Sequence, residues 1–317
     1  MNLIESYDII KDSIVAIIHK YTPIWKDESP PPEFPPILGT GFIVREDGLI
    51  VTNNHVLKLI PKLFKPPDRP KEEWPVMAFL LKNTSFGMLV IPLKVIGAFQ
   101  IGEFSPGSPY YGPKIPDVGF LYVKVKALPV LKINDKTELL REGLEVATAG
   151  FPMGTDALRA PGWLHQITPT LQRGIVSAVL PFRCASPHGF SINVMTQGGA
   201  SGSPVFLPET GEVIGILYGG LNDYSLTKNK DVYKVPTNIS YVVPAHFIYK
   251  SLNLIAKDEY FTLPQDTPTL QEMLDSFDPS NLPKNRYQIM AIEKKRVNKK
   301  VVKKIRNINP NTMANSG

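Results

Sequence analysis

Residues 197–204 read Gln-Gly-Gly-Ala-Ser-Gly-Ser-Pro, and a serine among small residues is the arrangement that a nucleophile loop needs. A serine hydroxyl is a poor nucleophile near neutral pH until a base accepts its proton. Short glycine and serine motifs also occur in ordinary surface turns, so the motif by itself is a weak signal. A prediction of catalysis at Ser201 therefore depends on a base and an acid elsewhere in the chain.

Two upstream residues, His55 and Asp117, have the side chains for those roles. His55 would accept the proton of Ser201, and Asp117 would hold the imidazole in one tautomer and balance its charge. Alone, His55 has the pattern of a surface or hydrogen-bonded histidine, and Asp117 that of an aspartate that opens a strand. Together the three residues predict a catalytic triad.

The chain around Ser201 also predicts how a negatively charged oxygen would be held. The backbone N–H groups of Gly199 and Ser201 would donate to this oxyanion, and one such donor contributes about 2.7 to 4 kcal/mol. Ser203 carries a second hydroxyl within reach. Gly199 and Gly202, which flank Ser201, favour Ser201 as the nucleophile. Ser203 is predicted to enter the next strand.

The elements that must position these residues are predicted to be strands. Residues 40–44 and 49–52 are rich in β-forming residues and flank a turn that ends in Asp47-Gly48, which predicts a hairpin. His55 falls where the second strand ends. Asp117 directly precedes an apolar run that predicts another strand.

Helices and an insert are predicted outside these strands. Residues 9–18 predict a short amphipathic helix that runs into the first strand, and residues 247–257 predict a helix that closes the fold. A Lys- and Pro-rich insert over residues 61–75 follows His55. This insert is either a solvated loop or a lid over the site.

Taken in order, these motifs are similar to those of the trypsin-like serine proteases, in particular the bacterial HtrA-like branch of the chymotrypsin fold. The order His, Asp, Ser is that of chymotrypsin-type enzymes. The resemblance runs from about residue 14 to residue 244 through the segments 40–42, 52–56, 117–121, 149–152, 174–178, 199–204 and 211–215.

The resemblance implies an all-β fold of two six-stranded antiparallel β-barrels of the chymotrypsin type, followed by a C-terminal helical extension. The protease domain is expected over residues 1–250, with the first barrel near 14–130 and the second near 140–245. The triad would lie in the cleft between the barrels. The extension, residues 251–317, contains one glycine, so a PDZ domain with its glycine-bearing peptide loop is not expected there.

The resemblance also has implications for zymogen activation and for the pocket that binds the residue before the scissile bond. Zymogen-activated members carry an aspartate where this chain has Ala200, so activation by a newly cut N-terminus is not expected. No acid occurs among the residues expected to line the pocket, and an unpaired cation is costly to bury. An uncharged, small-to-medium apolar side chain is therefore expected before the scissile bond. The expected lining residues are Met195, Thr196, Leu217, Tyr218, Gly219 and Ser240.

Composition sets wider limits. The chain has 317 residues, of which 43% are hydrophobic, enough for one large or two smaller cores. A single cysteine, Cys184, excludes an internal disulfide. The first residues carry acids where a signal peptide carries bases, and no apolar run of about 18 residues occurs. These features predict a cytoplasmic protein.

No cofactor and no metal site are predicted. The other four histidines show no ligand spacing with one another or with the cysteine, and no phosphate-cradling glycine loop occurs. These histidines are His19, His165, His188 and His246.

The segment 283–317 carries the basic character of the chain. It holds ten Lys or Arg residues and one acid, a net charge of +9, whereas the whole chain carries +6. Val297, Val301, Ile305 and Ile308 recur at helical spacing. The segment is therefore either a helix packed on the barrels or a contact for nucleic acid, an anionic membrane or an acidic protein.

The sequence as a whole predicts a serine endopeptidase that hydrolyses protein or peptide substrates through an acyl-enzyme intermediate. An alternative is a catalytically inactive protease-fold binding module that acts through its cleft and its basic tail. A homo-oligomer is left open.

Overall fold

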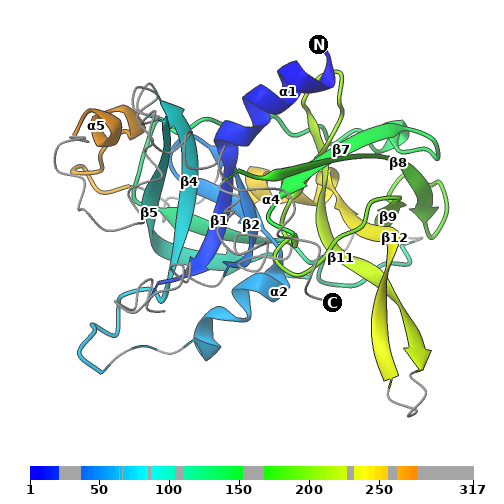
Figure 1. Ribbon diagram of the computed structural model, residues 1–317, viewed down its shortest axis with the longest axis horizontal. Coiled ribbons are helices and arrows are strands. Elements are labelled where there is room, and N and C mark those ends of the chain that lie inside the picture. The colour runs from blue at the N-terminus through cyan, green and yellow to red at the C-terminus, as the bar shows by residue number, and fades with distance from the viewer. Residues whose placement is uncertain are drawn as a thin grey trace, which may run out of the picture. The chain divides into compact units, whose positions relative to one another are not determined.

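The computed structural model describes residues 1–20, 37–63, 65, 67–84, 87–103, 110–152, 168–226, 232–255 and 263–276 (Figure 1). The chain divides into two compact units, Met1–Leu81 with Val90–Phe277 and Lys82–Leu89 with Asp278–Gly317. Every candidate site residue belongs to the first of these units. The domain boundary expected after residue 250 stays a prediction.

The first barrel closes from six strands in the order β1-β2-β3-β6-β5-β4. Its predicted hairpin is present, because Phe42 pairs with Val51 and Ile43 with Ile50. Gly48 in the turn has φ +99, and a Cβ there would lie 2.2 Å from a backbone oxygen, so the turn requires glycine. The strands are β1 (Ile14–His19), β2 (Ile37–Arg45), β3 (Leu49–Thr52), β4 (Val76–Thr84), β5 (Gly87–Gln100) and β6 (Gly119–Val123).

The second barrel closes in the order β10-β11-β12-β9-β8-β7, so the all-β fold with two six-stranded antiparallel barrels is confirmed. Its core is a cluster of buried apolar side chains that includes Phe190, Val205 and Leu217. Inward-facing residues of successive strands supply this cluster because side chains alternate between the two faces of a strand. The strands are β7 (Glu145–Gly150), β8 (Thr170–Leu180), β9 (Gly189–Ile192), β10 (Pro204–Phe206), β11 (Val213–Leu226) and β12 (Val232–Pro244).

The N-terminal helix differs from the prediction for residues 9–18. Helix α1 spans Leu3–Ile10, and a 3-10 turn over Lys11–Ser13 separates it from β1. Asn2 starts the helix with a capping box that involves Glu5. The prediction of helix beyond residue 10 is wrong, because the run 14–18, in which four of five residues are β-branched, is buried between β2 and β4, where such side chains favour a strand.

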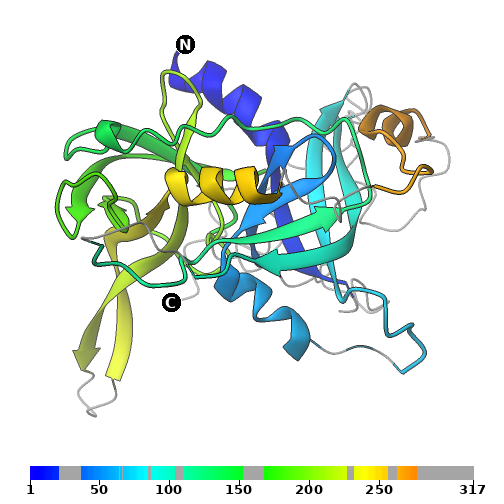
Figure 2. The same cartoon turned by 180° about the vertical axis from the view of Figure 1, so that it is seen from behind.

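The remaining helices lie at the site and near the C-terminus. Helix α2 (Asn54–Leu57) carries His55, and α4 (Ala245–Ile255), gold in Figure 2, is the closing helix predicted over residues 247–257. Helix α5 (Leu270–Asp275) belongs to the extension, whose basic segment 283–317 lies outside the described residues. Two 3-10 helices, η2 (Ile60–Lys62) and η3 (Thr137–Leu139), complete the set within the described residues.

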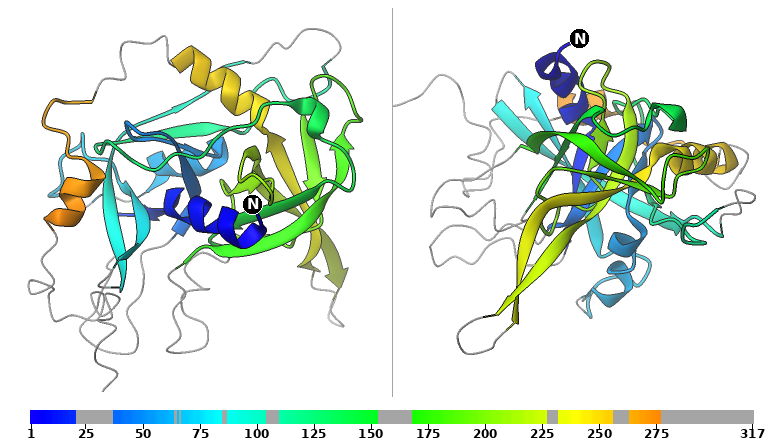
Figure 3. Two further views of the ribbon diagram at one scale, coloured as in Figure 1. Left: turned by 90° about the horizontal axis from the view of Figure 1, so that it is seen from above. Right: turned by 90° about the vertical axis from the view of Figure 1, so that its right-hand side faces the viewer.

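Strands β11 and β12 continue past the second barrel as a two-stranded hairpin (Figure 3). Their pairing runs from Gly215 opposite Pro244 to Leu226 opposite Val232. Strand β10 accompanies β11 only as far as Ile216. The outer part of the hairpin is therefore a ribbon without a third strand in the described part of the chain.

Helix α4 makes the stability of the fold dependent on pH through His246, which is 5% exposed. Burial, followed by the nearby Lys250 cation, lowers the pKa of His246 from 6.5 to about 4. The folded state then binds fewer protons than the unfolded state between these values, so stability falls as the pH drops from about 6.5 to about 4.

We expect His246 to account for a loss of about 3 kcal/mol in the free energy of unfolding over this pH window. Urea unfolding at pH 7.5 and pH 4.5 measures the loss. The variant His246→Gln should show a smaller difference between the two pH values than the wild type. An unchanged pH dependence in His246→Gln would contradict the assignment.

Candidate active site

The site begins with His55 and Asp117, which the fold brings together across 62 residues of sequence. His55 is the second residue of α2, directly after β3 ends. The Asp117 carboxylate accepts the His55 backbone N–H at 2.9 Å and contacts the ring Nδ1 at 2.6 Å. With the Nδ1 proton directed at the carboxylate, the lone pair of Nε2 is left to accept a proton.

The start of β6 fixes Asp117 relative to α2. Asn53 donates from its side-chain amide to the Asp117 carbonyl at 2.8 Å. Gly119 allows the helix to pack closely on the strand, since a Cβ there would lie 2.5 Å from a Leu57 methyl carbon. The spacing Asp117-Val118-Gly119 thus combines a carboxylate with the glycine that α2 needs as a neighbour.

The loop before β10 holds Ser201 in a turn that depends on glycine. The Ala200 N–H donates to the Gln197 carbonyl at 3.1 Å, and Gly199 has φ +91. A positive φ at the third residue is the signature of a type II turn. Gly202 has φ +92, and a Cβ there would lie 1.9 Å from the Thr40 oxygen.

Thr40 of β2 fastens this loop of the second barrel to the first barrel. Its N–H donates to the Ser201 carbonyl and its hydroxyl to the Gly199 carbonyl, each at 2.8 Å. The same hydroxyl accepts the Phe151 N–H at 3.1 Å. Thr40 is fully buried. The carbonyls of Gly199 and Ser201 are thereby held on the Thr40 side of the loop.

The two serines of the loop have different surroundings. Ser201 Oγ donates to the Tyr218 carbonyl at 3.4 Å. Within the described residues no hydrogen bond joins it to the His55 ring. Ser203 is 2% exposed, and its hydroxyl donates to the Ala200 carbonyl at 2.6 Å. Of the two hydroxyls, only that of Ser201 belongs to a residue that lines the adjacent pocket.

Tyr218 interacts with both Ser201 and Asp117. Its carbonyl accepts from Ser201, and its ring stacks on Tyr241 with the ring centres 6.0 Å apart. Burial, followed by Tyr241 and the Asp117 carboxylate, raises the pKa of Tyr218. The phenol therefore stays neutral beside the acid at neutral pH.

A cavity of about 280 Å³ opens beside Ser201, and the described residues that line it carry no charge. Of the residues expected to line it, Thr196, Leu217 and Gly219 do so. The other described residues that line the cavity are Gln197, Gly198, Ala200, Ser201, Gly220, Asn222 and Pro236.

The other three expected residues do not line the cavity itself. Met195 is 43% exposed, and Tyr218 contributes the backbone contact to Ser201 described above. Ser240 is fully buried and supports the wall: it bonds the Thr196 hydroxyl at 2.7 Å and donates to the Val194 carbonyl at 2.6 Å.

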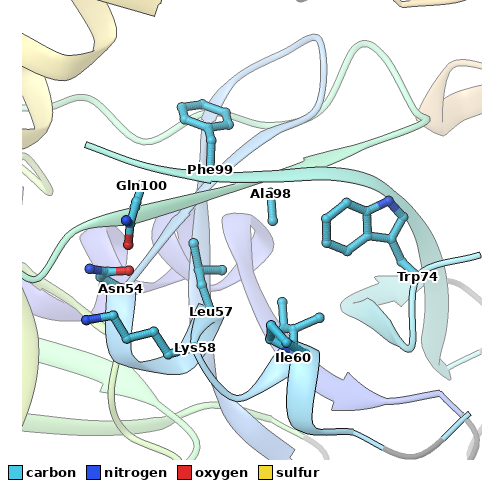
Figure 4. Close-up of a pocket in the computed structure, with 9 residues that line it drawn as sticks. Asn54, Leu57, Lys58, Ile60, Trp74, Ala98, Phe99 and Gln100 are labelled. Atoms are coloured by element: carbon cyan, nitrogen blue, oxygen red, sulfur yellow. The ribbon is translucent and has the colours of Figure 1, made fainter. Parts of the chain in front are cut away.

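A second cavity, about 270 Å³, lies against α2, the helix of His55 (Figure 4). Asn54 and Gln100 lie at one end of it and Trp74 at the other. Its walls are mostly apolar and include Leu57 and Ile60. Pro61 and Trp74 show that the two ends of the insert 61–75 form part of this wall.

The described residues contain no group of three or more His, Cys, Asp or Glu side chains that could hold a metal ion. The described helices include none that is long and apolar enough to cross a membrane.

Two closed antiparallel barrels with a His-Asp pair and a serine loop between them define a chymotrypsin-like fold. The family model of the trypsin-like peptidase domain matches residues 39–216, and the chain belongs to this family. The matched segment includes His55, Asp117 and Ser201.

Relatives confirm the resemblance to the HtrA-like branch. A probable periplasmic serine endoprotease, DegP-like, from Pseudomonas fluorescens is 32% identical over 183 residues, which cover 56% of this chain and 28% of that protein. Serine protease HTRA1 from Xenopus tropicalis is 28% identical over 255 residues, or 77% of this chain and 42% of that protein. The chain therefore spans less than half the length of these relatives.

Solved structures that match the chain include the HtrA-type protease AlgW with a decapeptide, at 15% identity and a TM-score of 0.47, covering 81% of this chain and 68% of that chain. The same protease with a tripeptide matches at 14% identity and 0.47, covering 81% and 64%. The DegP-like relatives are named as periplasmic, which does not support the predicted cytoplasmic location.

Proposed function

We propose that the protein is a serine endopeptidase in which Ser201 is the nucleophile, His55 the base and Asp117 the residue that orients His55. The observation that carries this proposal is the paired contact of Asp117 with the backbone and ring of His55, within a trypsin-like peptidase domain whose Ser201 lines a pocket. His55 Nε2 would accept the hydroxyl proton as Ser201 Oγ attacks the peptide carbonyl carbon.

In the next step the proton held by His55 is transferred to the leaving amine. The tetrahedral intermediate collapses, the C–N bond breaks, and His55 donates the proton to the departing amine. Water, deprotonated by His55, hydrolyses the acyl ester and restores Ser201. Asp117 stabilises the imidazolium that forms in each half of the reaction and keeps its negative charge throughout.

The backbone of the loop would stabilise the oxyanion. Among the described residues no backbone hydrogen bond occupies the N–H of Gly199 or of Ser201, so both would be available to the developing charge. Each such donor contributes about 2.7 to 4 kcal/mol to the transition state. The missing Ser201 to His55 hydrogen bond is compatible with this role, since catalytic hydrogen bonds often tighten only when substrate binds.

The pocket supports a preference for uncharged side chains before the scissile bond. No acid occurs among the described residues that line the cavity beside Ser201, and leaving a Lys or Arg cation unpaired in it costs several kcal/mol. We expect kcat/KM for peptides with a small-to-medium apolar residue at this position to exceed that for Lys or Arg peptides by about 100-fold or more. A peptide-library cleavage profile measures this ratio, and preferred cleavage after Lys or Arg would contradict the pocket assignment.

The contacts predicted for the basic segment 283–317, the oligomeric state and the cytoplasmic location stay predictions. The substrate is proposed only by chemical class, as a protein or peptide with an apolar residue before the cleaved bond.

A further inference from the structure

The cavity against α2 exists because strand β5 presents a small side chain there. Phe99 stacks on the buried Phe120 ring, with the ring centres 5.0 Å apart. Because side chains alternate between the two faces of a strand, Ala98 lies on the opposite face, where it lines the cavity. Figure 4 shows its methyl group pointing into the space between Leu57 and Trp74. A larger residue at position 98 would therefore fill the cavity.

One end of this cavity holds a hydrogen-bond acceptor that needs a donor. Asn54 is 5% exposed, and its side-chain oxygen Oδ1 has no hydrogen-bond partner within the described part of the chain. Figure 4 shows this oxygen turned toward Leu57. The terminal torsion of an asparagine side chain is broad, so a small rotation presents the oxygen to a donor in the cavity. Folded proteins pair nearly all buried polar atoms, so Asn54 points to a ligand that donates a hydrogen bond.

Size and charge define the rest of the ligand. An engineered apolar cavity of about 150 Å³ in another protein binds benzene. The cavity against α2 measures about 270 Å³ and has Ile60 and Trp74 in its walls, so it has room for a bicyclic aromatic ring. Lys58 is the one charged residue among the described residues that line it, and its ammonium group repels a cationic ligand. A neutral bicyclic aromatic molecule with one N–H donor fits these features.

The cavity lies against the elements that hold His55 and Asp117. Asn54 directly precedes His55, and Leu57 lines the cavity one turn further along α2. On its other side Leu57 packs on Gly119, where a Cβ would lie 2.5 Å from a Leu57 methyl carbon and 3.3 Å from the Asn54 Cα. Gly119 follows Asp117 by two residues. A ligand that contacts Leu57 therefore holds α2 against the start of β6.

We propose that this cavity binds a small, neutral bicyclic aromatic molecule that donates an N–H to Asn54, and that the bound molecule activates the enzyme by restraining α2. Helix α2 has four residues and a hollow beside it, so it opens locally at low cost. A ligand favours the conformation that binds it, here the one in which Asp117 contacts His55. The two cavities share no described lining residue, so the ligand acts on kcat and not on KM. Activation rests on the proposed peptidase function, whereas binding does not.

Indole is the probe for binding, and benzofuran, which has the same bicyclic shape but no N–H, is the matched control ligand. Titration of the full chain, followed by ligand-detected NMR, measures both dissociation constants. We expect a Kd of about 0.1 to 1 mM for indole, in the range open to so small a ligand. Benzofuran should bind about threefold to tenfold more weakly, because it leaves the Asn54 oxygen unpaired. The variant Asn54→Leu should bind the two ligands equally.

Two variants of β5 locate the binding. Ala98→Phe places a ring in the cavity and should weaken indole binding by about tenfold or more. Lys94→Phe adds the same side chain at an exposed position of the strand that does not line the cavity, and it should leave the Kd unchanged. Absence of indole binding, or equal affinity in folded Ala98→Phe and the wild type, overturns the site. Equal affinity of the wild type for indole and benzofuran overturns the role of Asn54, and this comparison needs no variant to fold.

Peptide cleavage tests the activation. Saturating indole should raise kcat of the wild type by about fivefold and leave KM within about twofold, and Ala98→Phe should not respond. Indole that binds but leaves kcat unchanged or lowers it overturns the activation, as does an equal rise in Ala98→Phe. A wild-type protein that cleaves no peptide with or without indole contradicts the proposed peptidase function instead, and the NMR titrations then still decide whether the site binds its ligand.

Discussion

Replacing Ser201 by alanine should lower kcat for peptide hydrolysis by about 10⁶-fold, because the variant lacks the hydroxyl that we propose as the nucleophile. The pocket beside Ser201 and the loop held by Thr40 remain intact in this variant, so KM should change little. The measurement is the hydrolysis rate of the best library peptide, with circular dichroism to show that the variant is folded.

Ser203→Ala is the matched control for this experiment. The Ser203 hydroxyl is buried and donates to the Ala200 carbonyl, so its removal costs about 1 kcal/mol of stability and leaves the nucleophile in place. We expect kcat within a few-fold of the wild type, since no role in proton transfer is assigned to this hydroxyl. The reverse result, an active Ser201→Ala and an inactive Ser203→Ala, would assign the chemistry to the other serine.

Replacing Asp117 by asparagine should lower kcat by about 10⁴-fold with little change in the fold. The amide can still accept the His55 backbone N–H, but it no longer favours the tautomer with a proton on Nδ1 and no longer balances the imidazolium. Because the three residues act as a unit, the double variant Asp117→Asn with Ser201→Ala should be no slower than Ser201→Ala alone.

Asp47→Asn is the control for Asp117. Asp47 is a partly exposed acid of the first barrel that pairs with Arg45 in the hairpin turn. Its replacement should leave kcat unchanged. An Asp117→Asn variant that retains kcat within tenfold of the wild type would show that Asp117 does not orient the base.

Individual strands could be predicted from the sequence because their signals are local, whereas the two barrels were implied by the resemblance to trypsin-like proteases. Runs such as Phe42-Ile43-Val44, with an Asp-Gly turn, define a hairpin within a dozen residues. The run 14–18 misled the helix prediction, since its apolar residues fit one face of a helix as well as a buried strand. Its neighbours β2 and β4, which lie far apart in sequence, decide the outcome.

The pocket could be predicted only in part, because its walls depend on long-range register. The resemblance to trypsin-like proteases implies Thr196, Leu217 and Gly219, but Asn222 and Pro236 meet only through the pairing of β11 with β12. No local pattern gives that register. Ser240 lies near the pocket as expected, yet its hydroxyl is used to hold Thr196.

Apart from a short motif, nothing in the sequence predicted the contacts of Thr40. Its hydroxyl reaches two residues more than a hundred positions away, Phe151 and Gly199. A threonine in a strand is common, so only the packed barrels identify it as the residue that fastens the serine loop.

The most direct test of the central proposal is mass-spectrometric mapping of the folded protein after reaction with a fluorophosphonate, which labels serines activated by a neighbouring base. The account predicts a single adduct on Ser201, present in Ser203→Ala, absent in Ser201→Ala and strongly slowed in Asp117→Asn. A folded wild-type protein without a Ser201 adduct, or an equal adduct in Ser201→Ala, would contradict it.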